Sequence, residues 1–230
     1  MRKLSRRHKE NIEKTKNKIC SGLDEAIEIL KKTATTKFVE SVELHANLNI
    51  DPKYADQQLR TTVTLPHGIG KKLIIAVLTN NENFEEAKNA GADIIGNEEL
   101  ITNITQKNIT FDLLVATPNM MPKLAKLGRV LGPKGLMPSP KSGTVSTSLK
   151  TTLTEFKKGK FEYKADKTGV LHVSFGKTDF TNNQLNENLV ALYQSIEQNR
   201  PSGVKGKYFK SLFVCTTMGP SIKLDLSAFA

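Results

Sequence analysis

Cysteine is scarce in this chain, and long apolar runs are missing. Its 230 residues contain only Cys20 and Cys215, without CxxC spacing or a neighbouring histidine, so the sequence predicts neither a disulfide framework nor a zinc site. Cys215 lies in an apolar run and is interpreted as a small core residue. No stretch approaches about 18 uninterrupted apolar residues, which argues against a membrane span. The charged N-terminus has no apolar segment behind it, so we expect no secretory signal.

Catalytic motifs are missing as well. Gly176-Lys-Thr178 resembles the end of a phosphate-binding loop, but Leu171 stands where that loop requires glycine. The glycine-rich segment 128–135 lacks the GK[ST] ending. His45 falls on the polar side of a predicted strand, where we expect it to be solvated. No histidine has an acid nearby at metal-ligand spacing; the four are His8, His45, His67 and His172. We therefore predict a protein that is not an enzyme and that uses no metal and no cofactor.

Positive charge is the main feature that is present. There are 34 Lys and Arg against 23 Asp and Glu, a net charge of +11 and a pI of about 9.6. Residues 1–20 alone hold eight basic residues and two Glu. This balance favours a polyanionic partner, with nucleic acid first and an anionic membrane second. The alternative interpretation of these basic residues is that they form the solvated face of a surface helix.

Hydrophobic periodicity changes along the chain. Residues 9–32 have helical spacing, whereas 42–50 and 60–65 alternate and are typical of an antiparallel sheet with one wet face. After Gly70 the pattern becomes buried strands that alternate with helices, which indicates a parallel sheet. The strands are expected at 72–78, 92–96 and 111–116, and the helices at 83–90, 98–104 and 120–127.

The antiparallel pattern returns near residue 160. Segments 160–165 and 169–175 flank a turn at 166–169, and we interpret them as a hairpin. An amphipathic helix follows at 184–198. The last strands are expected at 212–217 and 221–226.

These patterns predict an α+β domain with an inserted three-layer α/β domain, in which a parallel sheet is flanked by helices. Residues 1–69 and 159–230 would form the first domain, and 70–158 the second. Two chain segments cross between them and would act as a two-stranded hinge. The glycines expected there are Gly68, Gly70 and Gly159. The alternative is a single continuous sheet.

Two loops stand out. Residues 127–140 contain many glycines and prolines with apolar residues between them, and we expect an ordered loop that displays Arg129 and Lys134. Residues 216–220 join two apolar strands. They are interpreted either as a hairpin turn in which Gly219 supplies a positive φ, or as a recognition edge for a sugar-phosphate backbone.

These same loops carry a family resemblance. Residues 127–138 (LGRVLGPKGLMP) and 216–220 (TTMGP) closely resemble the hallmark segments of the first large-subunit ribosomal protein family, which forms the mobile stalk beside the tRNA exit site. The resemblance covers essentially the whole chain. It implies a discontinuous RNA-binding domain with an inserted Rossmann-like domain on a hinge.

The resemblance also implies contact residues for large-subunit ribosomal RNA. They are Phe38, Ser211, Thr217, Met218 and Gly219, with Lys37 alongside, and the weaker candidates are Lys167, Gly169 and His172. For Phe38 the alternative is a core aromatic, and for Lys167 a solvated turn charge. Arg129 and Lys134 would touch rRNA or the departing tRNA, or their loop would only brace the inserted domain.

Segments 200–211 and 218–226 look like those of cyanobacterial and plastid members. We therefore expect a ribosomal protein of the plastid stroma, with the bacterial cytoplasm as the alternative. The family role implies release of deacylated tRNA from the exit site, and in bacterial relatives repression of the protein's own mRNA. We expect no membrane partner and a monomer when the protein is free. The competing classes are a nucleotide-binding enzyme, which lacks a complete phosphate loop, and a membrane binder, which lacks an aromatic anchor.

Overall fold

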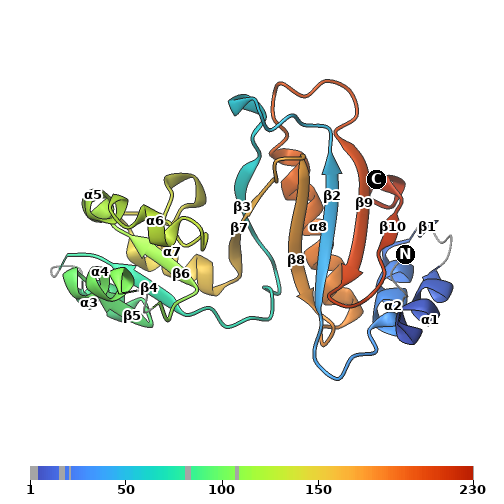
Figure 1. Cartoon of the computed structure of the whole chain (residues 1–230), viewed down its shortest axis with the longest axis horizontal. Coiled ribbons are helices and arrows are strands. Elements are labelled where there is room, and N and C mark those ends of the chain that lie inside the picture. Colours follow the sequence, from blue (N-terminus) through green and yellow to red (C-terminus); the bar gives the residue numbers. More distant parts are fainter. Residues whose placement is uncertain (1–4, 16–18, 21, 81–83, 107–108, 230) are drawn as a thin grey trace. The chain divides into compact units, whose positions relative to one another are not determined.

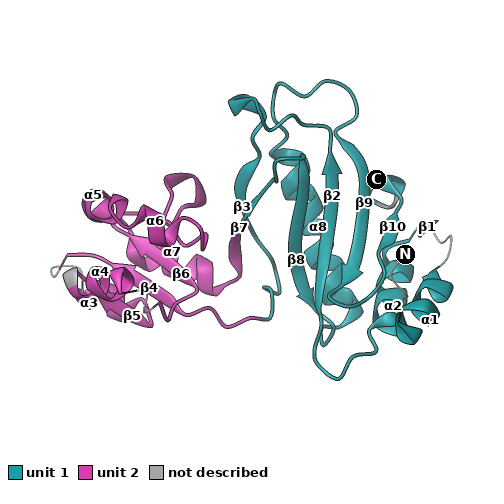
Figure 2. Ribbon diagram, viewed as in Figure 1, with its two compact units in different colours: residues 1–70, 162–230 teal, residues 71–161 magenta. Residues whose placement is uncertain are grey.

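The computed structural model describes residues 5–15, 19–20, 22–80, 84–106 and 109–229. They divide into two compact units, shown in different colours in Figure 2. Unit 1 lies within residues 1–70 and 162–230, so it uses both ends of the chain, and unit 2 is the continuous segment 71–161. The mixed α/β content expected from the sequence is confirmed.

Unit 1 contains a five-stranded sheet (Figure 1). Strand β2 (Ser41–Leu48) pairs antiparallel with β8 (Val170–Lys177) on one side and with β9 (Phe209–Thr216) on the other. Next to β9 lies β10 (Ile222–Leu224), again antiparallel, and β10 pairs in parallel with β1 (Ile19–Cys20). The two strands predicted near the C-terminus are therefore confirmed as β9 and β10.

Helices cover one face of this sheet. Both α2 (Leu23–Thr33) and α8 (Asn182–Gln198) pack on the sheet and against each other. A capping box starts α8: Thr181 Oγ1 accepts the Gln184 N–H, and the Gln184 side chain accepts the Thr181 N–H. In β2, every second side chain is buried on the helix side: Val42, Leu44, Ala46 and Leu48. We call the opposite side the open face.

The single helix predicted over 9–32 is wrong. The chain forms α1 (Arg6–Thr15) and α2, and β1 lies between them. Cys20 is fully buried in its parallel pairing with Leu224. This pairing requires extended backbone, so a helix cannot continue through it. Gly22 is then the N-cap of α2.

The strands predicted at 42–50 and 60–65 lie in different sheets. Strand β3 (Arg60–Thr64) pairs with β7 (Lys160–Lys164) in a separate two-stranded sheet, not with the 42–50 strand. Strands β7 and β8 belong to different sheets, so the predicted hairpin is confirmed only at its turn, where Ala165 and Leu171 form an antiparallel bridge and the Asp166 N–H donates to the Val170 carbonyl at 2.9 Å. The turn between them exists, since the Gly169 N–H donates to the Asp166 carbonyl at 3.2 Å. Alternation identifies a strand but does not identify its partner.

One buried amide ties the chain after β3 to α8. Asn188 is fully buried, and its Nδ2 donates to the carbonyls of Gly68 (3.0 Å) and Phe175 (2.8 Å). Its Oδ1 accepts the His67 N–H at 3.1 Å. Three glycines near the two crossings have positive φ: 63° at Gly68, 76° at Gly70 and 102° at Gly159. The segment that leaves unit 1 is thus fixed by Asn188 and is followed by backbone that favours glycine.

Unit 2 has a three-stranded parallel sheet. Its order is β5 (Ile94–Gly96), β4 (Ile75–Leu78), β6 (Leu113–Ala116), and every β4 side chain is buried. Ala76 and Leu78 pack with one group of helices, and Ile75 and Val77 with another. The first group is α4 (Glu98–Thr105), α5 (Met121–Ala125) and α6 (Gly128–Leu131), and the second is α3 (Phe84–Asn89) and α7 (Leu149–Lys157).

Short 3-10 turns complete the structure at Ala55–Gln57, Pro118–Met120, Pro140–Ser142 and Leu226–Phe229. Within the described residues, no helix combines the length and the apolar character that crossing a membrane requires.

Candidate RNA interface

The open face of unit 1 presents mostly polar side chains from three adjacent strands. Each outward position lies between two core positions, so the same alternation that builds the core builds this face. Two predicted contact residues, Ser211 and His172, belong to it. Its members are Ser41, Glu43, His45 and Asn47 of β2, Val170, His172 and Ser174 of β8, and Ser211, Phe213 and Cys215 of β9.

Apolar side chains are exposed at the end of the sheet where β2 begins and β9 ends. Phe38 is 55% exposed, Val39 45% and Met218 48%. The alternative of a core aromatic at Phe38 is therefore wrong. Lys37 beside it is exposed too. A group of exposed apolar side chains of this kind is typical of an interaction surface. We call Phe38, Val39 and Met218 the apolar end.

Hydrogen bonds join the two segments that form the apolar end. The Ser41 N–H donates to Thr217 Oγ1 at 3.0 Å, and the Thr217 N–H donates to the Ser41 carbonyl at 3.1 Å. The Met218 N–H donates to Glu40 Oε2 at 2.9 Å, while the Thr36 hydroxyl donates to Glu40 Oε1 at 2.8 Å. Segments about 180 residues apart in sequence are thus held as one surface.

Glu40 is the centre of this arrangement, and it is only 1% exposed. Burial is the largest single influence on its carboxyl and acts to raise the pKa. The hydrogen bonds from Met218 and Thr36 act in the opposite direction and prevail, so the pKa of Glu40 lies below its ordinary value. Sequence reasoning missed this residue, because a glutamate before a strand ordinarily indicates a solvated edge.

Gly219 is required by space and not by its backbone angle. It is not among the glycines with positive φ, so the φ expected for a hairpin glycine is wrong here. A Cβ at this position would lie 2.3 Å from Oγ1 of the buried Thr216. The Gly219 N–H also donates to the Thr216 carbonyl at 3.1 Å. Any side chain would therefore disturb the turn that carries Met218.

The remaining predicted contacts lie at the other end of the open face. Ser211 is opposite Asn47, six residues along β2 from Ser41, which corresponds to about 20 Å. Lys167 is exposed in the turn before β8. Gly169 accepts the Leu48 N–H at 3.1 Å through its carbonyl and is buried, so it acts through backbone packing.

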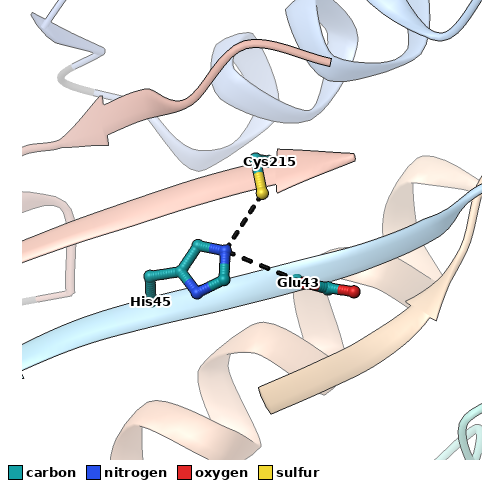
Figure 3. A group of neighbouring side chains, drawn as sticks. All are labelled: Glu43, His45 and Cys215. Atoms are coloured by element: carbon teal, nitrogen blue, oxygen red, sulfur yellow. Dashed lines mark hydrogen bonds and ion pairs between the residues drawn. The ribbon is translucent and has the colours of Figure 1, made fainter. Parts of the chain in front are cut away.

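The structure brings together a cluster that sequence reasoning missed (Figure 3). His45 Nε2 lies 3.1 Å from Cys215 Sγ and 3.8 Å from Glu43 Oε2, and His45 Nδ1 lies 2.8 Å from His172 Nδ1. The predictions of a solvated His45 and a core Cys215 are both wrong, because both side chains are half-buried on the open face. The apolar alternation of Leu212 and Val214 could have indicated that Cys215 points outward. Spacing along the chain, however, cannot show that β9 pairs with β2 and so brings Cys215 next to His45.

The surroundings of His45 and Cys215 favour the uncharged imidazole and the uncharged thiol at neutral pH. Burial, followed by the nearby His172, lowers the pKa of His45 and outweighs Glu43. Burial and then the Glu43 carboxylate raise the pKa of Cys215 to about 11.

In unit 2, both predicted basic residues are exposed. Arg129 lies in α6, and Lys134 follows in the next turn. The buried Leu127 and Leu131 anchor this segment in the unit 2 core. The 127–140 loop is ordered, as expected, but its first part is helical.

A basic chain with an open polar strand face and an exposed apolar end is typical of a nucleic-acid-binding type of protein. Residues 30–220 match the family described as ribosomal protein L1p/L10e. Relatives named large ribosomal subunit protein uL1c are 79% identical in Phaeodactylum tricornutum and 77% identical in Trieres chinensis, with all of both chains covered. A Prochlorococcus marinus protein named large ribosomal subunit protein uL1 is 55% identical over 99% of this chain and 97% of its own. The chain therefore belongs to the ribosomal L1 family.

Membership confirms the family resemblance and the prediction that the protein is not an enzyme. The relatives named uL1c, which also include one from Guillardia theta at 57% identity, are plastid proteins. They confirm the expected plastid location over the bacterial alternative.

Proposed function

We propose that unit 1 binds the ribosomal RNA of the large subunit through the apolar end and the open face. The observation that carries this proposal is the exposure of Phe38 and Met218 on a support fixed by Glu40. Rigid, exposed apolar groups gain contact with a sugar or base at little conformational cost. The names of the relatives support the large subunit as the assembly.

Hydroxyl groups at both ends of the open face would recognise the RNA backbone. Thr217 Oγ1 uses its hydrogen and one lone pair on Ser41, which leaves one lone pair to accept a ribose 2′-OH. Ser211 offers a second hydroxyl about 20 Å away along the strands. Two hydroxyl contacts at a fixed spacing read the shape of a folded RNA and not its sequence. His172 lies between them, and Lys37 and Lys167 are exposed beside the two ends for phosphate contact.

The finer family roles remain proposals for unit 2 and its connections. Arg129 and Lys134 offer exposed cations to exit-site tRNA. The positive-φ glycines Gly68, Gly70 and Gly159 would form the hinge between an RNA-binding domain and an inserted domain. An mRNA of this protein with the same local shape as the rRNA would compete for the open face.

The test compares one apolar contact with two charges. Met218→Asp should weaken binding to the stalk fragment of large-subunit rRNA by about thirtyfold or more, as expected for a central contact. Lys9→Gln/Lys14→Gln removes two exposed charges of α1 and should cost much less, although it changes the net charge more. Filter binding at physiological salt, with an unrelated hairpin of equal length as competitor, gives both affinities.

Equal losses in the two variants would overturn localised recognition. So would a salt dependence as steep as that of the unrelated hairpin, since phosphate contacts alone set that slope.

A further inference from the structure

The cluster at the centre of the open face contains three different metal-ligating groups. Glu43 and His45 are two residues apart on β2, so both side chains point to the same side. Cys215 is the register partner of Glu43 on β9. The three ligand atoms all lie within 4.8 Å of one another.

Their spacing matches a tetrahedral site. Zinc bonds of about 2.0–2.3 Å place neighbouring ligand atoms about 3.3–3.6 Å apart. In the cluster, His45 Nε2 is 3.1 Å from Cys215 Sγ and 3.8 Å from Glu43 Oε2. Both distances from His45 Nε2 therefore lie within a few tenths of an ångström of this range. The Cys215 and Glu43 ligand atoms lie within 4.8 Å of each other, and side-chain rotation would bring them closer around one ion.

His172 supplies the support that a histidine ligand needs. Its Nδ1 is 2.8 Å from His45 Nδ1, the ring nitrogen that does not face Cys215. If the His45 Nδ1–H donates to His172, then the lone pair of His45 Nε2 points to Cys215 and Glu43. A second residue that fixes the tautomer in this way is typical of metal-binding histidines.

A pocket of about 510 Å³ borders the cluster and gives an ion access. His45 and Cys215 form part of its wall, together with His8 and Thr15 of α1. The pocket leaves room for a water molecule or another donor in the fourth position, as in open zinc sites.

We propose that Glu43, His45 and Cys215 bind a zinc-class divalent cation, and that His172 is a positioning residue for His45. On binding, the Cys215 thiol releases its proton to solvent, and the thiolate bonds the ion. The evidence for this site is the cluster alone and does not include RNA binding, although the cluster and His172 lie on the open face that we propose binds RNA.

Cobalt(II) is the probe that tests this site, because a cobalt–thiolate bond gives a charge-transfer band in the near ultraviolet. The full untagged chain, reduced and freed of metal, should develop this band on Co²⁺ titration, and Zn²⁺ should abolish it. Cys215→Ser should remove the band, and Glu43→Gln should weaken cobalt binding while preserving the shape of the side chain. His172→Ala should lower the metal affinity about tenfold to a hundredfold.

His67→Gln is the matched control, since His67 also pairs with a carboxylate, Glu187 at 2.6 Å, but has no thiol partner. It should leave the band unchanged. The proposal is overturned if the wild type develops no band, if the band survives in Cys215→Ser and so belongs to the buried Cys20, or if His67→Gln weakens it as much as Glu43→Gln. Circular dichroism on each variant confirms that the chain is folded.

Discussion

Replacing Glu40 with Gln tests how the apolar end is held. The carboxylate accepts one hydrogen bond from the Met218 N–H and one from the Thr36 hydroxyl. Hydrogen bonds to a charged group contribute about 1.5–3 kcal/mol each. Gln has the same shape, and its oxygen can still accept the Met218 N–H. Its NH₂ group can donate to the Thr36 hydroxyl, which then donates to the Phe38 carbonyl 2.9 Å away. The substitution therefore removes the charge that strengthens both hydrogen bonds and keeps their geometry. We expect Glu40→Gln to lower the free energy of unfolding of unit 1 by about 2 kcal/mol at neutral pH.

The pH dependence of this loss follows from the lowered pKa of Glu40. A carboxyl whose folded pKa lies below its unfolded pKa stabilises the fold fully above the unfolded value, about 4.3 for Glu. This contribution disappears as the pH falls through the folded pKa. The difference between wild type and Glu40→Gln should therefore be largest at neutral pH and shrink below about pH 4.

Hydrogen exchange measured by mass spectrometry is the suitable assay, because a signal from the whole chain would mix the two units. Peptides from β2 and β9 report on unit 1. Glu28→Gln is the matched control, since Glu28 pairs with Lys32 on the exposed side of α2 and should contribute under about 1 kcal/mol. If Glu40→Gln costs no more than Glu28→Gln, or if its cost is the same at neutral and acid pH, then the reasoning about Glu40 is refuted.

Two further substitutions test close packing and the connection to unit 2. Gly219→Ala should destabilise unit 1 by about 1–3 kcal/mol and weaken rRNA binding, because the new Cβ meets the hydroxyl of Thr216. Gly128→Ala, with open space around it, should be nearly neutral when hydrogen exchange is measured in the peptides of its own unit. Asn188→Ala should cost about 2–4 kcal/mol, since it removes three hydrogen bonds to the backbone, whereas Asn183→Ala on the exposed side of the same helix should change hydrogen exchange in the unit 1 peptides little. A neutral Gly219→Ala or an Asn188→Ala no worse than Asn183→Ala would contradict these assignments.

Most individual elements could be predicted from the sequence, because burial imposes a period on each of them. The continuous apolar run at 72–78 and the amphipathic pattern at 184–198 correspond to β4 and α8. Strand partners could not be predicted. The 42–50 and 60–65 patterns are both those of half-buried strands, and nothing in either reveals that β2 pairs with β8 and β9 while β3 pairs with β7.

The same limit applies to the sites. Phe38 was found only through the family resemblance, whereas Met218 lies in the 216–220 loop that the sequence itself indicates as a turn or a recognition edge. The exposure of both agrees with a contact role that stays a prediction. Glu40, by contrast, has no sequence signal, since its partner Met218 lies at the far end of the chain. The cluster of Glu43, His45 and Cys215 was missed because its ligand spacing exists across strands and not along the chain.

The arrangement of unit 1 also sets the order in which the chain folds as it is synthesised. Both neighbours of β2 and the helix that packs on α2 come from residues 170–216, whereas unit 2 is one continuous segment that ends at residue 161. We expect unit 2 to fold first, while β2 waits without a partner. The first-made apolar side chains, among them Ile27 and Leu44, stay exposed to chaperones and to aggregation until β9 emerges. A translational pause late in the message would lengthen that exposure, and one early in the message would not.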